Sequence, residues 1–336
     1  MPPNAAPSWW IDTCFQFLDV CSAALRDQGL SVKSQGSFAQ GLAVEGSDLD
    51  AVIYRKGFEA PKGKAVVNAL TGASRRVMSY VNNGKGGPYM HLRTIERVPW
   101  ARIPLVKLQF TWGWPSGRGK PWTVEVDLSY GDETRGSYDT RIGTLVSSQP
   151  QLRTFLQTIK GWALSQEEGI LNSQRQALST FALILLGLCY YNRNLRREQP
   201  VEVDGFFHFI TREIGNLDAS VCHIWVEEGQ LKHVVDEEDD EDRSRLTRSP
   251  LKILVPGEGP ESNAARSLSR KMWMQVVYPA FERARPPRSS GDERGRVQNA
   301  AEFEFSKATT TKRTLFETKL RLHNDNEYVD CVFLLS

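Results

Sequence analysis

The sequence predicts an α+β protein: a mixed β-sheet with helices on one face, then a mainly helical part, and a small β extension at the C-terminus. Three observations predict this fold class. Short apolar runs bounded by glycine and proline fill residues 30–130 and are typical of strands. Between residues 151 and 284 apolar side chains recur mainly at helical spacing. Residues 303–336 alternate apolar and polar side chains again, which indicates a short β segment.

The individual elements follow from these patterns in chain order. Residues 9–26 carry apolar side chains at helical spacing and stop before Gly29, which predicts a first helix. Residues 180–192 are apolar all round, so their helix is expected to be buried. The expected strands are 30–34, 48–54, 91–98, 102–110 and 123–129, the other helices are 62–81, 151–163, 201–215 and 263–284, and a hairpin is expected at 221–235.

The same patterns divide the chain into three parts. Residues 30–145 form the expected catalytic sheet domain, and residues 1–29 with 146–285 form the expected helical domain. Residues 286–336 form a linker and a β extension that we expect to bridge the two domains.

Composition excludes several classes of partner. A formal net charge of +2 provides no overall field for nucleic acid, so any RNA contact must be local. The longest apolar run, residues 181–191, is about half of the roughly 20 residues that a membrane span needs, so no membrane partner is expected. The five cysteines lack paired spacing and are expected to be buried, reduced thiols.

Two acids at the start of an apolar strand are the central feature of the sequence. Asp48 and Asp50 are separated by one residue, and alternate residues of a strand share a face, so their carboxylates lie close together. Two like charges at that separation repel unless a cation lies between them. Oxygen ligands suit Mg²⁺, with Mn²⁺ as the alternative ion.

A third acid and a phosphate loop complete this predicted site. Residues 123–129 alternate apolar and polar side chains, and Asp127 on the polar face can complete a carboxylate triad, with Glu125 as its rival. Upstream, Gly36 and Ser37 follow a strand-like run and offer backbone N–H groups and a hydroxyl to a phosphate. A solvated Gly/Ser loop with an acidic turn is the purely structural alternative.

The string Gly36-Ser37-x3-Gly41, followed by Ser47-Asp48-x-Asp50 and a later strand acid, resembles the polymerase-β-type nucleotidyltransferase superfamily. Within it, residues 30–285 resemble terminal uridylyltransferases and noncanonical poly(A) polymerases. The resemblance implies a nucleotidyltransferase domain and a helical domain that form a cleft. It also implies transfer of UMP from UTP to the 3′-hydroxyl of single-stranded RNA, with Asp48, Asp50 and Asp127 as the catalytic metal ligands.

The resemblance implies further contacts to UTP and RNA. Lys160 lies in an I-K-x-W segment and would bind the triphosphate, although a lysine on an apolar stripe can also extend to solvent. Phe181 would stack on the base, or it could belong to the core. The implied substrate-binding residues are Gly36, Ser37, Ser47, Ser137, Lys160, Ser179, Thr180, Phe181 and Glu258, and the implied RNA-binding residues are Arg102 and Arg266.

Three departures from the family pattern bear on the choice of nucleotide. Gly136 replaces an asparagine that would touch the ribose, and Leu164 replaces a second lysine. Val255 stands where an acid would help to read uracil, which leaves Glu258 alone in that role. A noncanonical poly(A) polymerase therefore stays as an alternative. A primer-independent oligonucleotide or cyclic-dinucleotide synthase is a further alternative, and an inactive RNA-binding subunit is a third, although all three acids are present.

The compact size resembles that of the small kinetoplastid uridylyltransferases. This likeness implies a mitochondrial location and an RNA editing protein complex as partner, with a cytoplasmic location as the alternative.

Overall fold

The computed structural model describes residues 7–44, 47–86, 90–99, 103–113, 121–218, 220–235, 248–259, 262–285, 320–324 and 327–331. The chain divides into two compact units, Met1–Pro287 and Arg288–Ser336. The larger unit holds every described residue of the predicted site. Residues 286–319 of the predicted linker and β extension lie outside the described residues.

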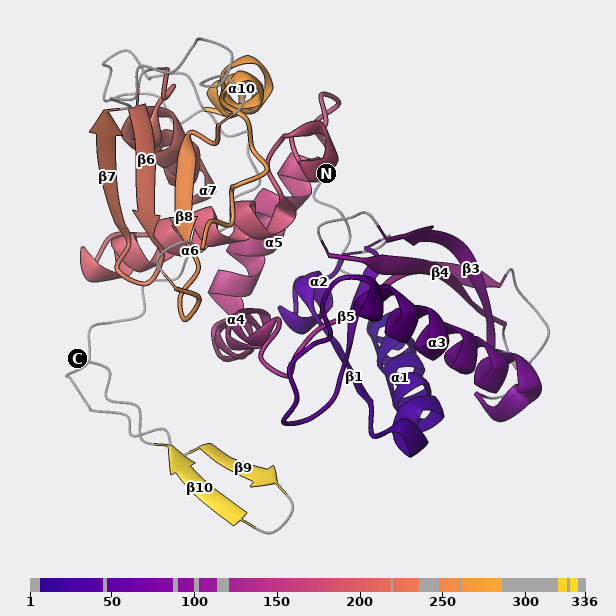
Figure 1. The fold of residues 1–336 in the computed structure, drawn as a ribbon. Helices are drawn as coiled ribbons and strands as arrows, with labels where there is room; N and C mark the ends of the chain where they lie inside the picture. The colour runs from indigo at the N-terminus through magenta and orange to yellow at the C-terminus, as the bar shows by residue number, and fades with distance from the viewer. Residues whose placement is uncertain are drawn as a thin grey trace. The chain divides into compact units, whose positions relative to one another are not determined.

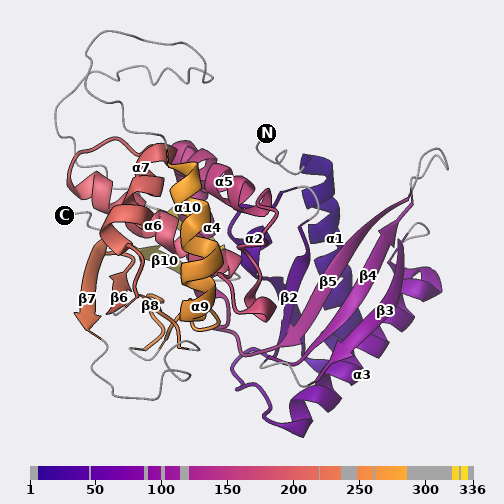
Figure 2. The ribbon, with the colours of Figure 1, turned by 90° about the horizontal axis from the view of Figure 1, so that it is seen from above.

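A five-stranded sheet forms the first half of the larger unit, in the strand order β1-β2-β5-β4-β3 (Figures 1 and 2). The central strands β2 and β5 are parallel, and the other neighbours are antiparallel, so the predicted mixed sheet is confirmed. The strands are β1 (Ser31–Ser34), β2 (Leu49–Tyr54), β3 (Met90–Val98), β4 (Leu105–Trp112) and β5 (Trp122–Tyr130).

Two helices, α1 (Ser8–Leu25) and α3 (Lys64–Tyr80), cover one face of this sheet (Figure 2). Cys14, Phe17 and Leu25 of α1 are fully buried in the same core as the inward residues of β2, β4 and β5. Assigning residues 1–29 to the helical domain was therefore wrong for α1. Helical spacing identifies the apolar face of a helix, but it does not show which core that face covers.

The short helix α2 (Gly36–Ala39) connects the sheet to the helical half by packing against α4 (Ser137–Ser148). The contact is very close at Gly143. A Cβ atom there would lie 2.2 Å from the carbonyl oxygen of Ala39, so only glycine fits without separating the two helices.

The helical half has its own core, which contains the inward residues of α4 to α10 and of a small sheet. The strand order of this sheet is β7-β6-β8. Besides α4, the elements of the helical half are α5 (Pro150–Leu164), α6 (Thr180–Arg196), α7 (Val203–His208), β6 (Ser220–Trp225), β7 (Gln230–Val235), β8 (Leu251–Leu254), α9 (Arg270–Met272) and α10 (Tyr278–Ala284). Short 3₁₀ turns span Arg26–Gln28 and Ser173–Arg175, and π-helical turns span Val81–Lys85, Phe209–Ile214 and Trp273–Val277.

Helix α6 is buried over most of its length, as its uniform apolar character predicts. None of the described helices is long and apolar enough to cross a membrane. The predicted helix 263–284 begins only at Arg270, where the hydroxyl of Ser269 accepts a hydrogen bond from the N–H of Met272 at 3.2 Å. Asn263 instead uses its side-chain amide to bind the backbone of Leu251, Ile253 and Ala265, which competes with helix formation.

The second unit contains an antiparallel hairpin of β9 (Leu320–Asn324) and β10 (Glu327–Cys331). This hairpin confirms the expected small β extension.

Candidate active site

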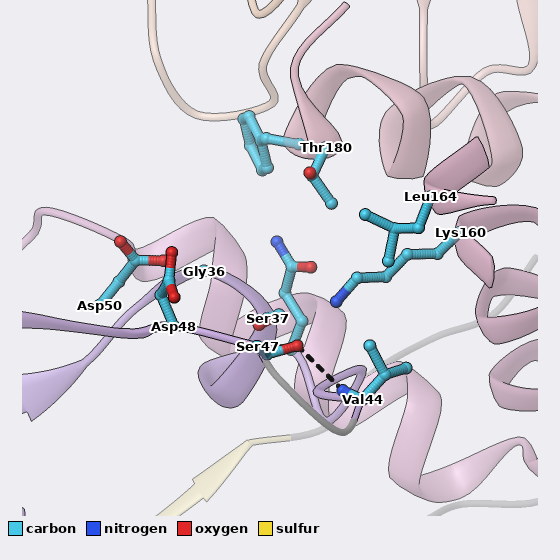
Figure 3. A pocket seen from close by; sticks show the side chains of 11 residues that line it. Gly36, Ser37, Val44, Ser47, Asp48, Asp50, Lys160, Leu164 and Thr180 are labelled. Atoms are coloured by element: carbon cyan, nitrogen blue, oxygen red, sulfur yellow. Dashed lines mark hydrogen bonds between the residues drawn. The ribbon is translucent and has the colours of Figure 1, made fainter. Parts of the chain in front are cut away.

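A pocket of about 440 Å³ lies where the α2 segment and the start of β2 face α5 and α6 (Figure 3). Eight of the predicted site residues line it, contributed by segments more than 100 residues apart in the sequence. Three further residues that the sequence did not single out as ligands also line it. The lining residues are Gly36, Ser37, Gln40, Val44, Ser47, Asp48, Asp50, Lys160, Leu164, Thr180 and Phe181.

Strand pairing places the third acid beside the first two. Asp50 on β2 is the register partner of Asp127 on the parallel strand β5. Burial, and then the charges of Asp127 and Asp48, raise the pKa of Asp50 to about 7. The pKa of Asp48 is raised by burial and then by Asp127 and Glu125. The charge of Asp127 thus acts on Asp50 of β2 and on Asp48 just before this strand, but that of Glu125 acts on Asp48 alone, which favours Asp127 as the third member.

Lys107 is a neighbour of the acids that the sequence analysis missed. It lies opposite Asp127 on β4, and its Nζ donates to the two carboxylate oxygens at 3.1 and 3.3 Å. Strand alternation puts Lys107 and Gln109 on one face of residues 105–112, but only the cross-strand register shows that Lys107 meets Asp127. Among the described residues, no three carboxylate, histidine or cysteine side chains lie together as a group that could hold a metal ion.

The predicted phosphate loop begins with Gly36, whose backbone lies close to Asp50 and leaves no room for a side chain. Gly36 has a φ of +60°, and a Cβ atom there would lie 2.5 Å from Oδ2 of Asp50. Its N–H donates to Oδ2 of Asp139 at 2.9 Å, and the side-chain amide of Gln40 donates to Oδ1 at 2.7 Å. The Gly36 N–H that the sequence offered to a phosphate therefore already has a partner, while Ser37 faces the pocket.

Asp139 was also missed, because it lies 103 residues from Gly36 in the sequence. It is a buried residue of α4. Burial raises its pKa, and the hydrogen bonds from Gly36 and Gln40 oppose that shift. At the far end of the loop, the hydroxyl of Ser47 accepts a hydrogen bond from the N–H of Val44 at 3.0 Å (Figure 3).

Lys160 on α5 is a cation on the wall of the pocket that faces the two acids and the α2 segment. Its side chain extends toward the loop that carries Ser37, Val44 and Ser47 (Figure 3), and its Nζ donates to the carbonyl of Leu42 at 2.9 Å. The residue is only 4% exposed, so it does not extend to solvent. Burial lowers its pKa to about 8, although Asp50 opposes the shift.

The start of α6 completes this wall. Thr180 and Phe181 line the pocket, and Phe181 also packs against the core of the helical half. Its stacking on a base stays a prediction. Ser179 caps α6 by accepting the N–H of Ala182 at 3.1 Å. Leu164, one turn after Lys160, is 50% exposed and lines the pocket.

The remaining predicted residues lie elsewhere. Ser137, Glu258 and Arg266 are exposed and are not among the residues that line the pocket, and Arg102 lies outside the described residues. Val255, at the position of the missing acid, is buried in the core of the helical half.

No family model matches this chain, and no curated protein matches it in sequence. Solved structures do resemble it. The structure of the Cid1 poly(U) polymerase is 16% identical over 83% of this chain and 88% of its own, with a TM-score of 0.57. A cytoplasmic RNA terminal U-transferase is 16% identical over 85% and 91%, with a TM-score of 0.55. The complex of mtPAP with UTP is 18% identical over 81% and 62%, with a TM-score of 0.53. The chain therefore has the fold of these nucleotidyltransferases.

Proposed function

We propose that this protein is an RNA terminal nucleotidyltransferase that adds UMP from UTP to the 3′-hydroxyl of single-stranded RNA and releases pyrophosphate. One observation carries the proposal. A single pocket joins the Gly36-Ser37 loop and two acids on one wall to a buried lysine and an aromatic side chain on the other. Metal-ligand carboxylates, a phosphate-binding cation and a base-stacking surface are the groups that this reaction needs.

The donor set fits Mg²⁺, and Mn²⁺ is the alternative. Asp48, Asp50 and Asp127 provide only oxygen ligands, and burial together with the neighbouring acids raises the pKa of Asp48 and of Asp50, a cost of ionisation that a bound cation would offset. These three residues would hold the ion or ions. When bound, the metal lowers the pKa of an attacking hydroxyl and neutralises charge on the transferred phosphoryl group.

The other side chains bind and orient the nucleotide. Lys160 provides an ammonium group for the triphosphate, and its buried position strengthens that interaction. Ser37 offers a hydroxyl to the same phosphates. Phe181 stacks on the base, which contributes roughly 1–3 kcal/mol of binding but little selectivity, because every base has a π-face.

A poly(A) polymerase is the second candidate, and a specific observation favours it. Glu258, the residue proposed to read uracil, is exposed and not among the residues that line the pocket, and Val255 is buried and apolar. The structurally similar mtPAP has been crystallised with UTP and with ATPγS. The primer-independent synthase differs from both because it would make product without RNA.

Extension of a labelled single-stranded RNA in Mg²⁺, with each nucleoside triphosphate supplied separately, tests the proposal. We expect addition of U. Addition of A alone would select the poly(A) polymerase, and product without primer would select the synthase. Asp127→Asn is expected to abolish transfer, whereas the matched variant Glu125→Gln keeps it; the reverse result would move the third-ligand role to Glu125.

The partner and the location of the protein are proposed only from the resemblance of its sequence to the uridylyltransferases. The small kinetoplastid enzymes, such as the trypanosomal minor editosome-associated terminal uridylyltransferase, support a mitochondrial RNA editing complex as partner. A cytoplasmic location is the alternative, and the structurally similar proteins include a cytoplasmic RNA terminal U-transferase. Fractionation of cells that express the tagged full chain distinguishes the two.

A further inference from the structure

Lys107 lies in a row of charged residues that pair in register across neighbouring strands, with Glu96 of β3 as the register partner on its other side. Asp50 on β2 is in register with Asp127 on β5, and Asp127 is in register with Lys107 on β4. Both partners of the Lys107–Asp127 ion pair are largely shielded, with 24% and 20% of their side chains exposed. Such a pair is less screened by solvent than a surface pair.

The positive charge of Lys107 opposes metal binding at Asp127. The Lys107 ammonium contacts both carboxylate oxygens of Asp127, at 3.1 and 3.3 Å. A magnesium ion requires near-ideal octahedral coordination and would need one of these oxygens. A cation already bound to the carboxylate opposes the approach of another, because like charges repel. Lys107 and a metal ion therefore compete for Asp127.

We propose that Lys107 is a positioning residue that serves as the counter-ion of Asp127 in the metal-free protein and must yield this carboxylate when metal binds. The inference rests on the proposed function, because it concerns the same three acids. Its consequence is weak metal binding before nucleotide arrives. The triphosphate then contributes the additional oxygen ligands that favour the metal over Lys107.

Manganese binding without nucleotide tests this competition. Lys107→Met removes the charge but keeps a similar unbranched side chain, and Lys107→Arg keeps the charge. We expect Lys107→Met to bind Mn²⁺ more tightly than wild type by roughly three- to tenfold, the range expected when one partly screened ion pair no longer opposes binding. Electron paramagnetic resonance of free Mn²⁺ measures this affinity, and Lys107→Arg should stay near wild type.

Thermal unfolding in EDTA provides a second readout that does not depend on catalysis. Without a counter-ion the three acids repel, so Lys107→Met should unfold at a lower temperature than wild type and gain more from added Mn²⁺. The matched control is Lys232→Met, which removes an exposed lysine from β7 and should change neither value.

Two negative outcomes have different meanings. If wild type binds Mn²⁺ in a manner that Asp127→Asn abolishes, but Lys107→Met matches wild type in affinity and in EDTA melting temperature, only the role of Lys107 is refuted. If wild type shows no Mn²⁺ binding that depends on Asp127, with or without nucleotide, the metal site of the proposed function is refuted together with the competition.

Discussion

Replacing Gly36 with alanine tests the contact between the phosphate loop and the acids. Gly36 has a φ of +60°, in the left-handed region, and its missing Cβ would lie 2.5 Å from Oδ2 of Asp50. Either the loop or the carboxylate must move by about 0.9 Å to reach an ordinary contact distance of 3.4 Å. Gly36→Ala therefore displaces Asp50, a proposed metal ligand, without removing any polar group.

The loss in free energy of unfolding caused by Gly36→Ala has two parts. A matched variant, Gly29→Ala, separates them. An L-residue in the left-handed region costs about 1–2 kcal/mol, and overpacking adds about 1–3 kcal/mol. Gly29 has a φ of +65° with nothing within 4 Å of its ideal Cβ, so Gly29→Ala carries the backbone cost alone. We expect Gly36→Ala to lower the free energy of unfolding by about 2–5 kcal/mol and Gly29→Ala by about 1–2 kcal/mol.

Activity should separate the two variants further. A misplacement of about 1 Å in a catalytic group can cost roughly a hundredfold in rate. Primer extension at saturating nucleotide should therefore fall by about that factor for Gly36→Ala and stay near wild type for Gly29→Ala. Circular dichroism confirms that both variants fold at the assay temperature. Turnover of Gly36→Ala within a few fold of Gly29→Ala would refute the link between this glycine and Asp50.

Three further predictions concern the remaining buried groups. Asp139→Ala leaves the Gly36 N–H and the Gln40 amide without their acceptor, so urea unfolding should show a free energy of unfolding lower by about 1–3 kcal/mol per group. Asp139→Asn retains one acceptor oxygen and should lower the free energy of unfolding less. Lys160→Met should fold and lower kcat/KM for nucleotide by roughly ten- to hundredfold, measured in primer extension, because the charged hydrogen-bond donor proposed to bind phosphate is lost. The pKa of Asp50 is raised to about 7, so the native state binds its proton more tightly than the unfolded chain, and stability in EDTA should fall as the pH rises from about 4 through 7. Asp50→Asn should remove that part of the pH dependence of the melting temperature, and an unchanged profile would contradict the assignment.

The elements of the site that depend on local pattern were predictable. Alternation alone puts Asp48 and Asp50 on one face of a strand, and Asp127 on the polar face of another, and the pairing of β2 with β5 then joins them. The helical stripe that predicts α5 places Lys160 on a helix, although its buried contact with Leu42 depends on how the two halves of the unit pack.

Asp139 and Lys107 were not predicted, because they act through contacts between segments that a local sequence pattern does not relate. Asp139 meets Gly36 across 103 residues, and Lys107 meets Asp127 only because β4 and β5 pair in one register. The same limitation explains the wrong placement of α1, since its apolar stripe fits a helical core as well as the face of a sheet. The late start of α9 has a local cause, because the side chain of Asn263 binds the backbone that a helix would otherwise use.

The Gly36 turn lies between the two halves of the larger unit and depends on both. From the sheet side, the N–H of Gln35 donates to the carbonyl of Asp50 at 3.0 Å. From the helical side, Asp139 on α4 accepts the N–H of Gly36, and the close contact at Gly143 leaves α4 no room to approach α2 further. A shift of α4 therefore moves the turn, and the turn contacts the carboxylate of Asp50. The packing of α4 on α2 thus helps to fix both the pocket proposed to bind nucleotide and the position of Asp50 within it.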